Sequence, residues 1–351
     1  MQLNVALIGQ SDAGTADVFN AIVGPHVIED SHARVPRRTG TLQLPDERLE
    51  QLASAVGSQS VVHAKFTLWE YPGLGIELGV EPDSASVGDL RNADILVLVV
   101  RVGATDDRVR AIRDTTAELA TELAIRDVEV VEGALARARE RVDHGPRVER
   151  RDAEHTVELL TRLGDVVGQS MVLDGNTLTS IERRELSGFA LFALKPRAVV
   201  VNVPDVHAQA MQQVTGPINC CDVIAGRMES ELWDLEADEA QDFRDDLGLY
   251  STAGARISGA IMEAAALQVF YTANRSAATS WLLPVGGTAL DAARTVHSDF
   301  AERFIRADVA RADEVIAAGG LAPLRDAGRL RSAGRNQEVG DRDLLHIHFS
   351  R

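Results

Sequence analysis

Residues 3–23 read LNVALIGQSDAGTADVFNAIV. The stretch opens with an apolar run that ends at Gly9, and the apolar residues from Val18 to Val23 take helical spacing. A strand, a glycine loop and a helix follow one another in this order, which is how an α/β unit begins. The N-terminal part is therefore predicted to contain a sheet with helices packed on it.

Three more apolar runs are predicted to be strands of the same sheet. They cover residues 64–69, 95–100 and 198–203. The last two show no alternation of apolar and polar side chains, which suits a parallel sheet that is covered on both faces. Strands that alternate with helices then predict a doubly wound α/β fold.

About a hundred residues separate the last two of these strands, far more than one crossover needs. Apolar residues over 128–167 take helical spacing on both sides of a break at His144-Gly145-Pro146, which predicts an antiparallel helical hairpin. Thr179 and Glu182 have the spacing of a capping box that starts a further helix, expected to end near Lys195-Pro196. The α/β domain is therefore split in sequence.

A change of pattern at Leu267 predicts a small C-terminal α+β module. Its strands are expected at 269–271, 280–285 and 345–349, with a helix over 288–300. His346 and His348 share one face of the last strand, where we expect a solvated surface because no carboxylate or cysteine nearby in the sequence completes a metal site. The predicted domains are 1–118 and 179–266 for the split α/β domain, 119–178 for the hairpin and 267–351 for the module.

Charge and composition narrow the class of protein. The formal net charge of −17 repels nucleic acid over long range and argues against a general DNA- or RNA-binding coat. The acidity is confined to residues 1–125 and 152–266, whereas residues 126–151 around the hairpin tip and the C-terminal module are close to neutral. No run approaches the ~18 apolar residues of a membrane helix and no signal peptide is recognisable, so we expect a cytoplasmic protein without membrane contact.

The adjacent Cys220 and Cys221 are expected to be ordinary small residues near a strand.

Several segments resemble the YchF/Obg-like family of P-loop ATPases. The loop at 9–16 with Phe19-Asn20-Ala21 resembles the family's P-loop and first helix, and residues 39–49 resemble its switch region. The C-terminal segments that resemble the family's TGS domain are FYTA at 270–273, WLLPVGGTA at 281–289, HSDF at 297–300 and FIRA at 304–307. The resemblance spans nearly the whole chain.

The resemblance implies a particular architecture and a particular biology. The fold would be a P-loop G-domain-like doubly wound sheet with an inserted antiparallel coiled-coil hairpin and a C-terminal α+β β-grasp (TGS) domain. Contact with ribosomes and a preference for ATP over GTP are also implied. Composition and spacing establish neither of these last two properties.

The glycine loop lacks the side chains that a working P-loop uses. The pattern G-x-x-x-x-G-K-[ST] offers backbone N–H groups and a lysine to the phosphates and a hydroxyl to Mg²⁺. Gly9 and Gly14 keep the spacing. Thr15 replaces the lysine and Ala16 replaces the hydroxyl, while Asp12 adds a carboxylate. A charge pair at about 4 Å is worth roughly 4 kcal/mol at an effective dielectric near 20, so triphosphate binding should weaken by orders of magnitude.

Other positions of the site are altered as well. By resemblance, Arg34 takes the position of the family's switch threonine, and Glu70 takes the position of its Walker B aspartate. Glu70 has a longer side chain than aspartate and is the one candidate for a metal ligand. Residues 75–83 are more acidic than the family's glycine-rich stretch. An arginine such as Arg34 or Arg37 would have to reach into the loop to replace the lysine, because the chain's only two lysines lie elsewhere.

The position that would recognise the base has two interpretations. The family uses Asn-x-x-Glu where GTPases use Asn-Lys-x-Asp, and this chain has Asn202-Val203-Pro204-Asp205 after a strand. The segment is either a degenerate base-binding pattern or a turn that ends the strand. The degenerate nucleotide-binding set is then Gly9, Asp12, Ala13, Gly14, Thr15, Ala16, Asn202 and Asp205. No catalytic residue is predicted, and His26, His32 and His63 are expected to be ordinary histidines.

Three functions follow as hypotheses. The first is a module without conventional hydrolysis that docks on the ribosome or an associated factor and requires no cofactor. The second is a sensor that binds ATP or GTP without turnover and without Mg²⁺, and the third is a residual ATPase with metal on Glu70. Six arginines near the hairpin tip either contact phosphates or form a solvated helix end: Arg137, Arg139, Arg141, Arg147, Arg150 and Arg151. DNA is not an expected partner.

Overall fold

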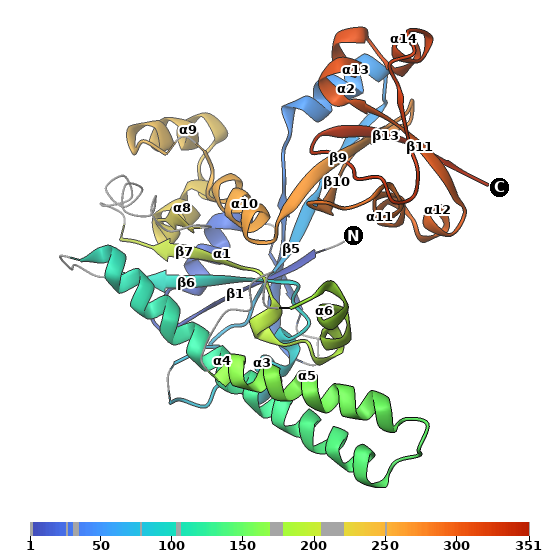
Figure 1. The fold of residues 1–351 in the computed structure, drawn as a ribbon. Coiled ribbons are helices and arrows are strands. Elements are labelled where there is room, and N and C mark those ends of the chain that lie inside the picture. Colours follow the sequence, from blue (N-terminus) through green and yellow to red (C-terminus); the bar gives the residue numbers. More distant parts are fainter. Residues whose placement is uncertain are drawn as a thin grey trace. The chain divides into compact units, whose positions relative to one another are not determined.

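The chain folds into two compact units. A computed structural model of the protein describes residues 3–25, 27–30, 35–77, 79–102, 107–168, 178–204, 221–249 and 251–350. The larger unit comprises Asn4–Gly40 and Leu68–Tyr250, and the C-terminal unit comprises Met1–Leu3, Thr41–Thr67 and Ser251–Arg351 (Figure 1). Residues 41–67 thus group with the C-terminal residues, which the predicted domain ranges did not anticipate.

A seven-stranded sheet forms the centre of the larger unit, in the order β2-β3-β5-β1-β6-β7-β8. The strands are β1 (Leu3–Gly9), β2 (Ile28–Asp30), β3 (Arg37–Gln43), β5 (Lys65–Glu70), β6 (Ile95–Arg101), β7 (Arg197–Asn202) and β8 (Cys221–Ile224). Strands β1, β6, β7 and β8 run parallel to one another. The three strands predicted from apolar runs are therefore confirmed as β5, β6 and β7.

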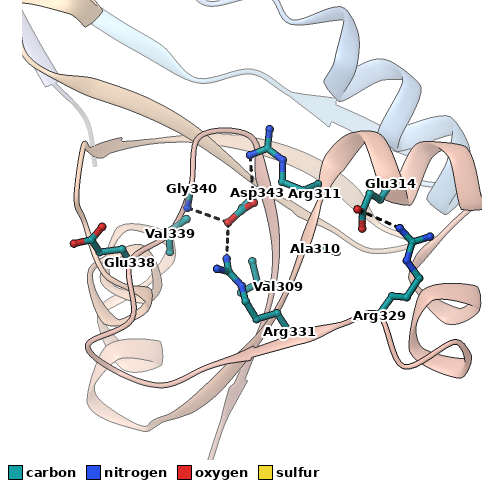
Figure 2. Close-up of a pocket in the computed structure, with 10 residues that line it drawn as sticks. All are labelled: Val309, Ala310, Arg311, Glu314, Arg329, Arg331, Glu338, Val339, Gly340 and Asp343. Carbon is teal, nitrogen blue, oxygen red and sulfur yellow. Dashed lines mark hydrogen bonds and ion pairs between the residues drawn. The ribbon is translucent and has the colours of Figure 1, made fainter.

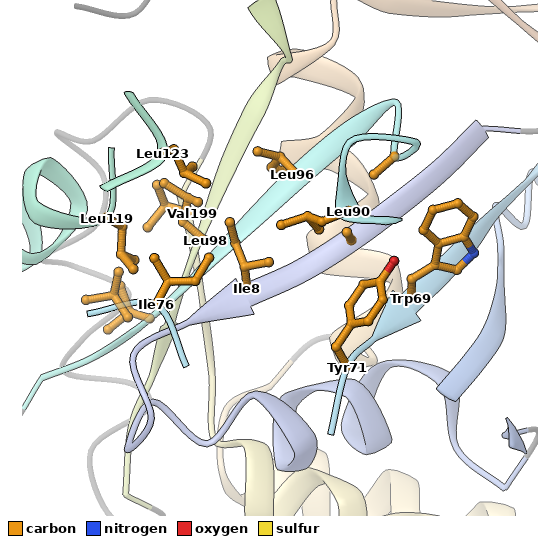
Figure 3. Close-up of a cluster of buried hydrophobic side chains, with 14 of the residues drawn as sticks. Ile8, Trp69, Tyr71, Ile76, Leu90, Leu96, Leu98, Leu119, Leu123 and Val199 are labelled. Atoms are coloured by element: carbon orange, nitrogen blue, oxygen red, sulfur yellow. The ribbon is translucent and has the colours of Figure 1, made fainter. Parts of the chain in front are cut away.

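Helices cover this sheet and extend from it. They are α1 (Thr15–Val23), α3 (Ser84–Leu90), α4 (Arg108–His144), α5 (Arg150–Gly168), α6 (Ser180–Leu186), α8 (Gly226–Glu231) and α9 (Ala237–Asp246), with the short 3₁₀ turns η1 (Ser187–Phe189), η2 (Phe192–Leu194) and η3 (Leu232–Asp234). Figure 3 shows buried side chains of β1, β5 and β6 that pack with Leu119 and Leu123 of α4. The same cluster buries Ile76, which fixes the segment after β5 on the sheet.

The predicted helical hairpin is present as α4 and α5. The turn lies at His144-Gly145-Pro146 as expected, because Gly145 takes an extended conformation after α4 and proline cannot continue the helix. Helix α4 begins at Arg108, however, and runs unbroken into the hairpin. The capping box of Thr179 and Glu182 starts α6 as predicted. The expected end of that helix near Lys195-Pro196 is wrong, because α6 ends at Leu186 and two 3₁₀ turns follow.

A six-stranded mixed sheet forms the C-terminal unit, in the order β12-β11-β13-β9-β10-β4. The strands are β4 (Ser60–Val62), β9 (Leu267–Ala273), β10 (Ala277–Pro284), β11 (Phe304–Arg311), β12 (Arg331–Ala333) and β13 (Asp343–Phe349). The helices are α2 (Glu47–Val56), α10 (Ala253–Ala264), α11 (Ala289–Val296), α12 (Ser298–Glu302), α13 (Ala312–Ala318) and α14 (Leu321–Asp326). The single helix expected over 288–300 is two, because His297 is extended and caps α12 through its ring nitrogen.

Residues 41–67 belong to this unit through several contacts. Helix α2 buries Leu49 and Leu52 in the C-terminal core, and its N-cap Asp46 accepts a hydrogen bond from the Tyr271 hydroxyl. Strand β4 pairs in parallel with β10. The part of the predicted switch region from residue 41 onward therefore lies outside the unit that carries the glycine loop. No helix in the described ranges is long and apolar enough to span a membrane.

Candidate nucleotide-binding site

The glycine loop joins β1 to α1 at the carboxyl edge of the parallel strands, where α/β proteins bind ligands. Gly14 is the N-cap of α1 and is left-handed, with φ of +71°. A Cβ on Gly14 would lie 2.4 Å from Asn202 Nδ2, and one on Gly9 would lie 2.6 Å from the Val99 carbonyl oxygen. Packing alone therefore requires glycine at both positions. The spacing of the two glycines is for this reason no evidence of phosphate binding.

Asn202 braces the loop from the end of β7. Its Nδ2 donates to the Ala13 carbonyl oxygen at 2.8 Å, and its Oδ1 accepts from the Gly226 N–H at 3.1 Å. The side chain is buried, and both of its polar ends are used within the protein. This geometry favours a structural role at this position, and Asp205, its predicted partner, lies outside the described residues.

The two substituted P-loop positions begin α1. Thr15 is half-buried and Ala16 exposed. Thr15 brings no amine to the lysine position, and Ala16 brings no hydroxyl to the magnesium position. Arg101, at the end of β6, donates to the Asp12 carbonyl oxygen at 3.1 Å. The sequence analysis missed Arg101, although its place after a predicted parallel strand puts it at the same sheet edge.

The arginines proposed as substitutes for the P-loop lysine are placed differently. Arg37 forms an ion pair with Asp89 at 2.7 Å and lies over the Trp69 ring, with its guanidinium carbon 4.1 Å from the ring centroid. Because these contacts engage the Arg37 guanidinium, we do not expect it to bind phosphate. Arg34, His26 and His32 lie outside the described residues. His63 belongs to the C-terminal unit.

A carboxylate of the protein occupies part of the loop. Ile76 donates its N–H to the Gly9 carbonyl oxygen at 2.9 Å, which holds the segment after β5 against the loop. The adjacent Glu77 then accepts from the Ser11 N–H at 3.2 Å. A loop N–H that would face phosphate in a working P-loop thus faces an internal anion. Hydrogen bonds from the Ser11 hydroxyl and N–H lower the pKa of Glu77.

Acidification should release the Ser11 N–H. The lowered pKa of Glu77 means that the contact is complete above the ordinary value of 4.5 and is lost as pH falls through the lower folded pKa. We expect the Ser11 amide shift in a ¹H–¹⁵N spectrum to titrate with a midpoint below 4.5. A Glu77→Gln variant should abolish this titration and leave that of Ser86, which Asp83 caps, unchanged. A midpoint at or above the ordinary value would contradict the contact.

Glu70, the candidate metal ligand, is neutralised by an arginine. Arg38 Nε donates to Glu70 Oε2 at 2.7 Å, and the side chains are only 18% and 4% exposed, respectively. Arg38 Nη1 also donates to Asn20 Oδ1 at 3.1 Å, and the guanidinium carbon lies 5.0 Å from the centroid of the Phe19 ring. A metal ion at Glu70 would have to displace the guanidinium of Arg38, which is partly buried.

The residues present do not fit Mg²⁺. The carboxylate at the Walker B position is paired, and the hydroxyl of the P-loop is replaced by Ala16. In the part of the chain that the structure describes, no group of three or more His, Cys, Asp or Glu side chains is arranged to hold a metal. Asp308, which the sequence analysis did not anticipate, lies 2.9 Å from His348 Nε2 in the C-terminal unit, and this contact alone does not complete a metal-binding set.

The C-terminal unit contains a separate cavity of about 480 Å³, shown in Figure 2. Asp343 is buried at its base and accepts from Arg331 Nη2 at 3.0 Å, with Arg311 3.7 Å away. Arg329 pairs with Glu314 at 3.2 Å across the rim. The arginines of the cavity are thus balanced by its own carboxylates, and we assign no ligand to it.

The fold and the loop define a P-loop protein of the G-domain type with an inserted helical hairpin. A family model described as YchF-GTPase_C, a protein of unknown function (DUF933), matches residues 267–350. Relatives named ribosome-binding ATPase YchF, from Haemophilus ducreyi and Bacillus subtilis, are 27% and 25% identical, and each alignment covers 100% of both chains. The solved structure of the Schizosaccharomyces pombe YchF GTPase has a TM-score of 0.75 at 19% identity and covers 99% of this chain and 98% of that one, which is a likeness of fold. These matches support the resemblance of the chain to the YchF/Obg-like family.

Proposed function

We propose that this chain is a docking module for the ribosome or a ribosome-associated factor that has lost conventional Mg²⁺-dependent nucleotide hydrolysis. Its relatives are named ribosome-binding ATPases, which supports the partner class. The observation that carries the loss of hydrolysis is the buried Arg38–Glu70 pair, because it neutralises the carboxylate that would serve the metal. The Glu77 carboxylate on the Ser11 N–H supports the same conclusion.

Electrostatics explains how these contacts oppose a triphosphate. The loop lacks its lysine, Glu77 places a carboxylate on the Ser11 N–H, and Asp12 adds a further acidic residue to the loop. Like charges repel, so both carboxylates oppose an anionic ligand, although solvent screens groups as exposed as these. The N-terminus of α1 alone offers only about 0.3–1 kcal/mol to an anion. Arg101, which donates to the Asp12 carbonyl oxygen, adds some attraction, and the two carboxylates oppose it, so we expect net phosphate binding to be weak.

Calorimetric titration of nucleotide-stripped protein with ATP and GTP tests the loss of binding. We expect no heat for the natural chain, with or without Mg²⁺. The Thr15→Lys/Ala16→Ser double variant should gain measurable affinity, and adding Glu77→Ala should strengthen it by a further factor of about ten or more. The triple variant measures the nucleotide affinity that the fold can reach once the lysine and hydroxyl are restored and the Glu77 carboxylate is removed.

A second candidate function is a nucleotide sensor that needs no Mg²⁺. The retained loop shape and the N-terminus of α1 favour it, since backbone N–H groups bind anions without a metal. Micromolar binding by the natural chain that is indifferent to Mg²⁺ would establish this alternative. Binding that Mg²⁺ strengthens would overturn the proposal and point to a rewired NTPase.

Co-sedimentation with purified ribosomes tests the docking itself. The hairpin-tip residues Arg147, Arg150 and Arg151 are all exposed, as phosphate contacts would require. We expect the natural chain to pellet with ribosomes whether or not nucleotide is present, and charge reversal at these three positions to reduce the bound fraction about tenfold at low salt. Charge reversal at Arg227, Arg294 and Arg303 provides a matched control. A natural chain that stays in the supernatant would refute the docking role.

A further inference from the structure

The segment around α9 presents large apolar side chains to solvent. Trp233, Leu235 and Phe243 are 43%, 36% and 54% exposed. Helix α9 contacts η3, so the elements that carry Phe243 and Trp233 are neighbours, and Leu235 lies in the short link between them. We call residues 231–246 the α9 surface. Exposed aromatic residues gathered in one such segment are typical of an interaction site.

Trp233 is held in a fixed orientation although it is exposed. Its Nε1 donates to the Ala21 carbonyl oxygen at 3.0 Å. The indole lies directly against Gly24, where a Cβ would come within 2.6 Å of the ring. Binding of a partner over this ring therefore costs little side-chain entropy of Trp233, because the ring is already held in place. Fixed tryptophans of this kind dominate the energetics of many protein interfaces.

Acidic residues surround these apolar side chains. Residues 234–246 contain seven aspartates and glutamates, all exposed, and one basic residue, Arg244. Arg244 donates to Gln241 Oε1 at 3.3 and 3.4 Å. Within the described ranges no ion pair links Arg244 to these carboxylates, so the surface keeps a strong negative potential. Such a potential repels phosphate and attracts cationic side chains.

We propose that the α9 surface binds a basic amphipathic segment of another protein. Its apolar side chains cover Trp233 and Phe243, and its arginine or lysine side chains face the acidic rim. Charge complementarity excludes ribosomal RNA from this surface, so the partner is a protein wherever the chain docks. The proposal goes beyond the proposed function and does not depend on the state of the glycine loop.

A synthetic peptide tests the surface directly. The probe is a helical peptide of about 16 residues with arginines on one face and leucines at i, i+3, i+4 and i+7 on the other. The matched peptide carries serine in place of every leucine. We expect the leucine peptide to bind the full chain about tenfold or more tightly than the serine peptide. With phenylalanine at Trp69 and Trp281, it should also shift Trp233 emission to shorter wavelength.

Variants separate the apolar contribution from the charge. Leu235→Ser/Phe243→Ser should weaken the leucine peptide about tenfold, and so should Asp238→Asn/Glu239→Gln/Asp242→Asn at low salt. Asp152→Asn/Glu154→Gln/Glu158→Gln removes three exposed acids from α5 and should leave the affinity unchanged. All these side chains are exposed, so circular dichroism should confirm an unaltered fold.

Three outcomes would overturn the proposal: no binding, equal affinity for the two peptides, or equal loss in the two charge variants. Equal affinities would mean that the surface acts only as a polyanion. Ribosomes and nucleotides are absent from this experiment. A negative peptide result would therefore not affect the conclusions from nucleotide titration and ribosome co-sedimentation. Negative results in those two experiments would likewise not affect the peptide result.

Discussion

Replacing Arg38 with alanine is expected to lower the free energy of unfolding of the larger unit by about 3–5 kcal/mol. The substitution leaves the Glu70 carboxylate without its cation in a position that is 4% exposed. Arg38 also donates to Asn20 and lies over Phe19, so those contacts are lost as well. A buried charge without a partner costs more than the pair contributed, because the desolvation of Glu70 is no longer offset.

Urea unfolding followed by the fluorescence of Trp69 measures this effect. Phenylalanine at the other two tryptophan positions makes Trp69, which is buried in the same unit, the sole reporter. The exposed i,i+4 pair of Arg110 and Asp114 supplies the control, where Arg110→Ala should cost less than about 1 kcal/mol. The Arg38→Met/Glu70→Gln double variant removes both charges and should recover most of the loss.

The same experiment tests the metal argument. Mg²⁺ should not raise the stability of the natural chain, because Arg38 already neutralises Glu70. A cost below about 1 kcal/mol for Arg38→Ala, or a marked stabilisation by Mg²⁺, would show that Glu70 is accessible. Either result would return the hydrolase hypothesis to consideration.

Removing the carboxylate of Asp127 should have an effect of similar size. Asp127 lies on α4 and is fully buried. It accepts from the N–H groups of Phe192 and Ala193 at 3.1 and 2.7 Å, and forms an ion pair with Arg91 at 2.8 Å. Asp127→Ala leaves two backbone donors without an acceptor and Arg91 without its carboxylate, although Arg91 keeps its hydrogen bonds to the Ala190 and Arg126 carbonyl oxygens. We expect a loss of about 3–5 kcal/mol.

This prediction concerns how the hairpin helix is joined to the sheet. The Phe192 and Ala193 amides belong to η2, which leads the chain back into β7. Their hydrogen exchange should accelerate strongly in Asp127→Ala and less in Asp127→Asn, which keeps one acceptor. Asp143→Ala removes an exposed carboxylate from the same helix and should change neither stability nor exchange. Unchanged exchange in Asp127→Ala would contradict the proposed joint.

Much of the fold was predictable because its elements have local causes. The unbroken apolar runs at 95–100 and 198–203 predicted buried parallel strands, since only a sheet covered on both faces buries both sides of a strand. The break at Gly145-Pro146 and the Thr179 capping box also act through the backbone of a few residues. The end of α6 was missed although Ser187-Gly188, a dipeptide that marks turns, directly follows the helix.

The assignment of residues 41–67 to the C-terminal unit was not predictable from local patterns. Helix α2 has an ordinary N-cap and an ordinary amphipathic face, which identify a helix and not the core that it joins. Leu49 and Leu52 pack with Tyr271, more than two hundred residues away in the sequence. Only the tertiary fold selects that partner.

The residues alone show that the glycine loop lacks its lysine and hydroxyl, since a missing functional group cannot be restored by folding. Which side chains of the protein contact the glycine loop and Glu70 depends on the tertiary structure. Glu77 on Ser11, Arg38 on Glu70 and Arg101 on Asp12 are contacts across 66, 32 and 89 residues of sequence. No local pattern encodes such pairs, because the sheet brings the ends of separate strands together at one edge only after the chain has folded.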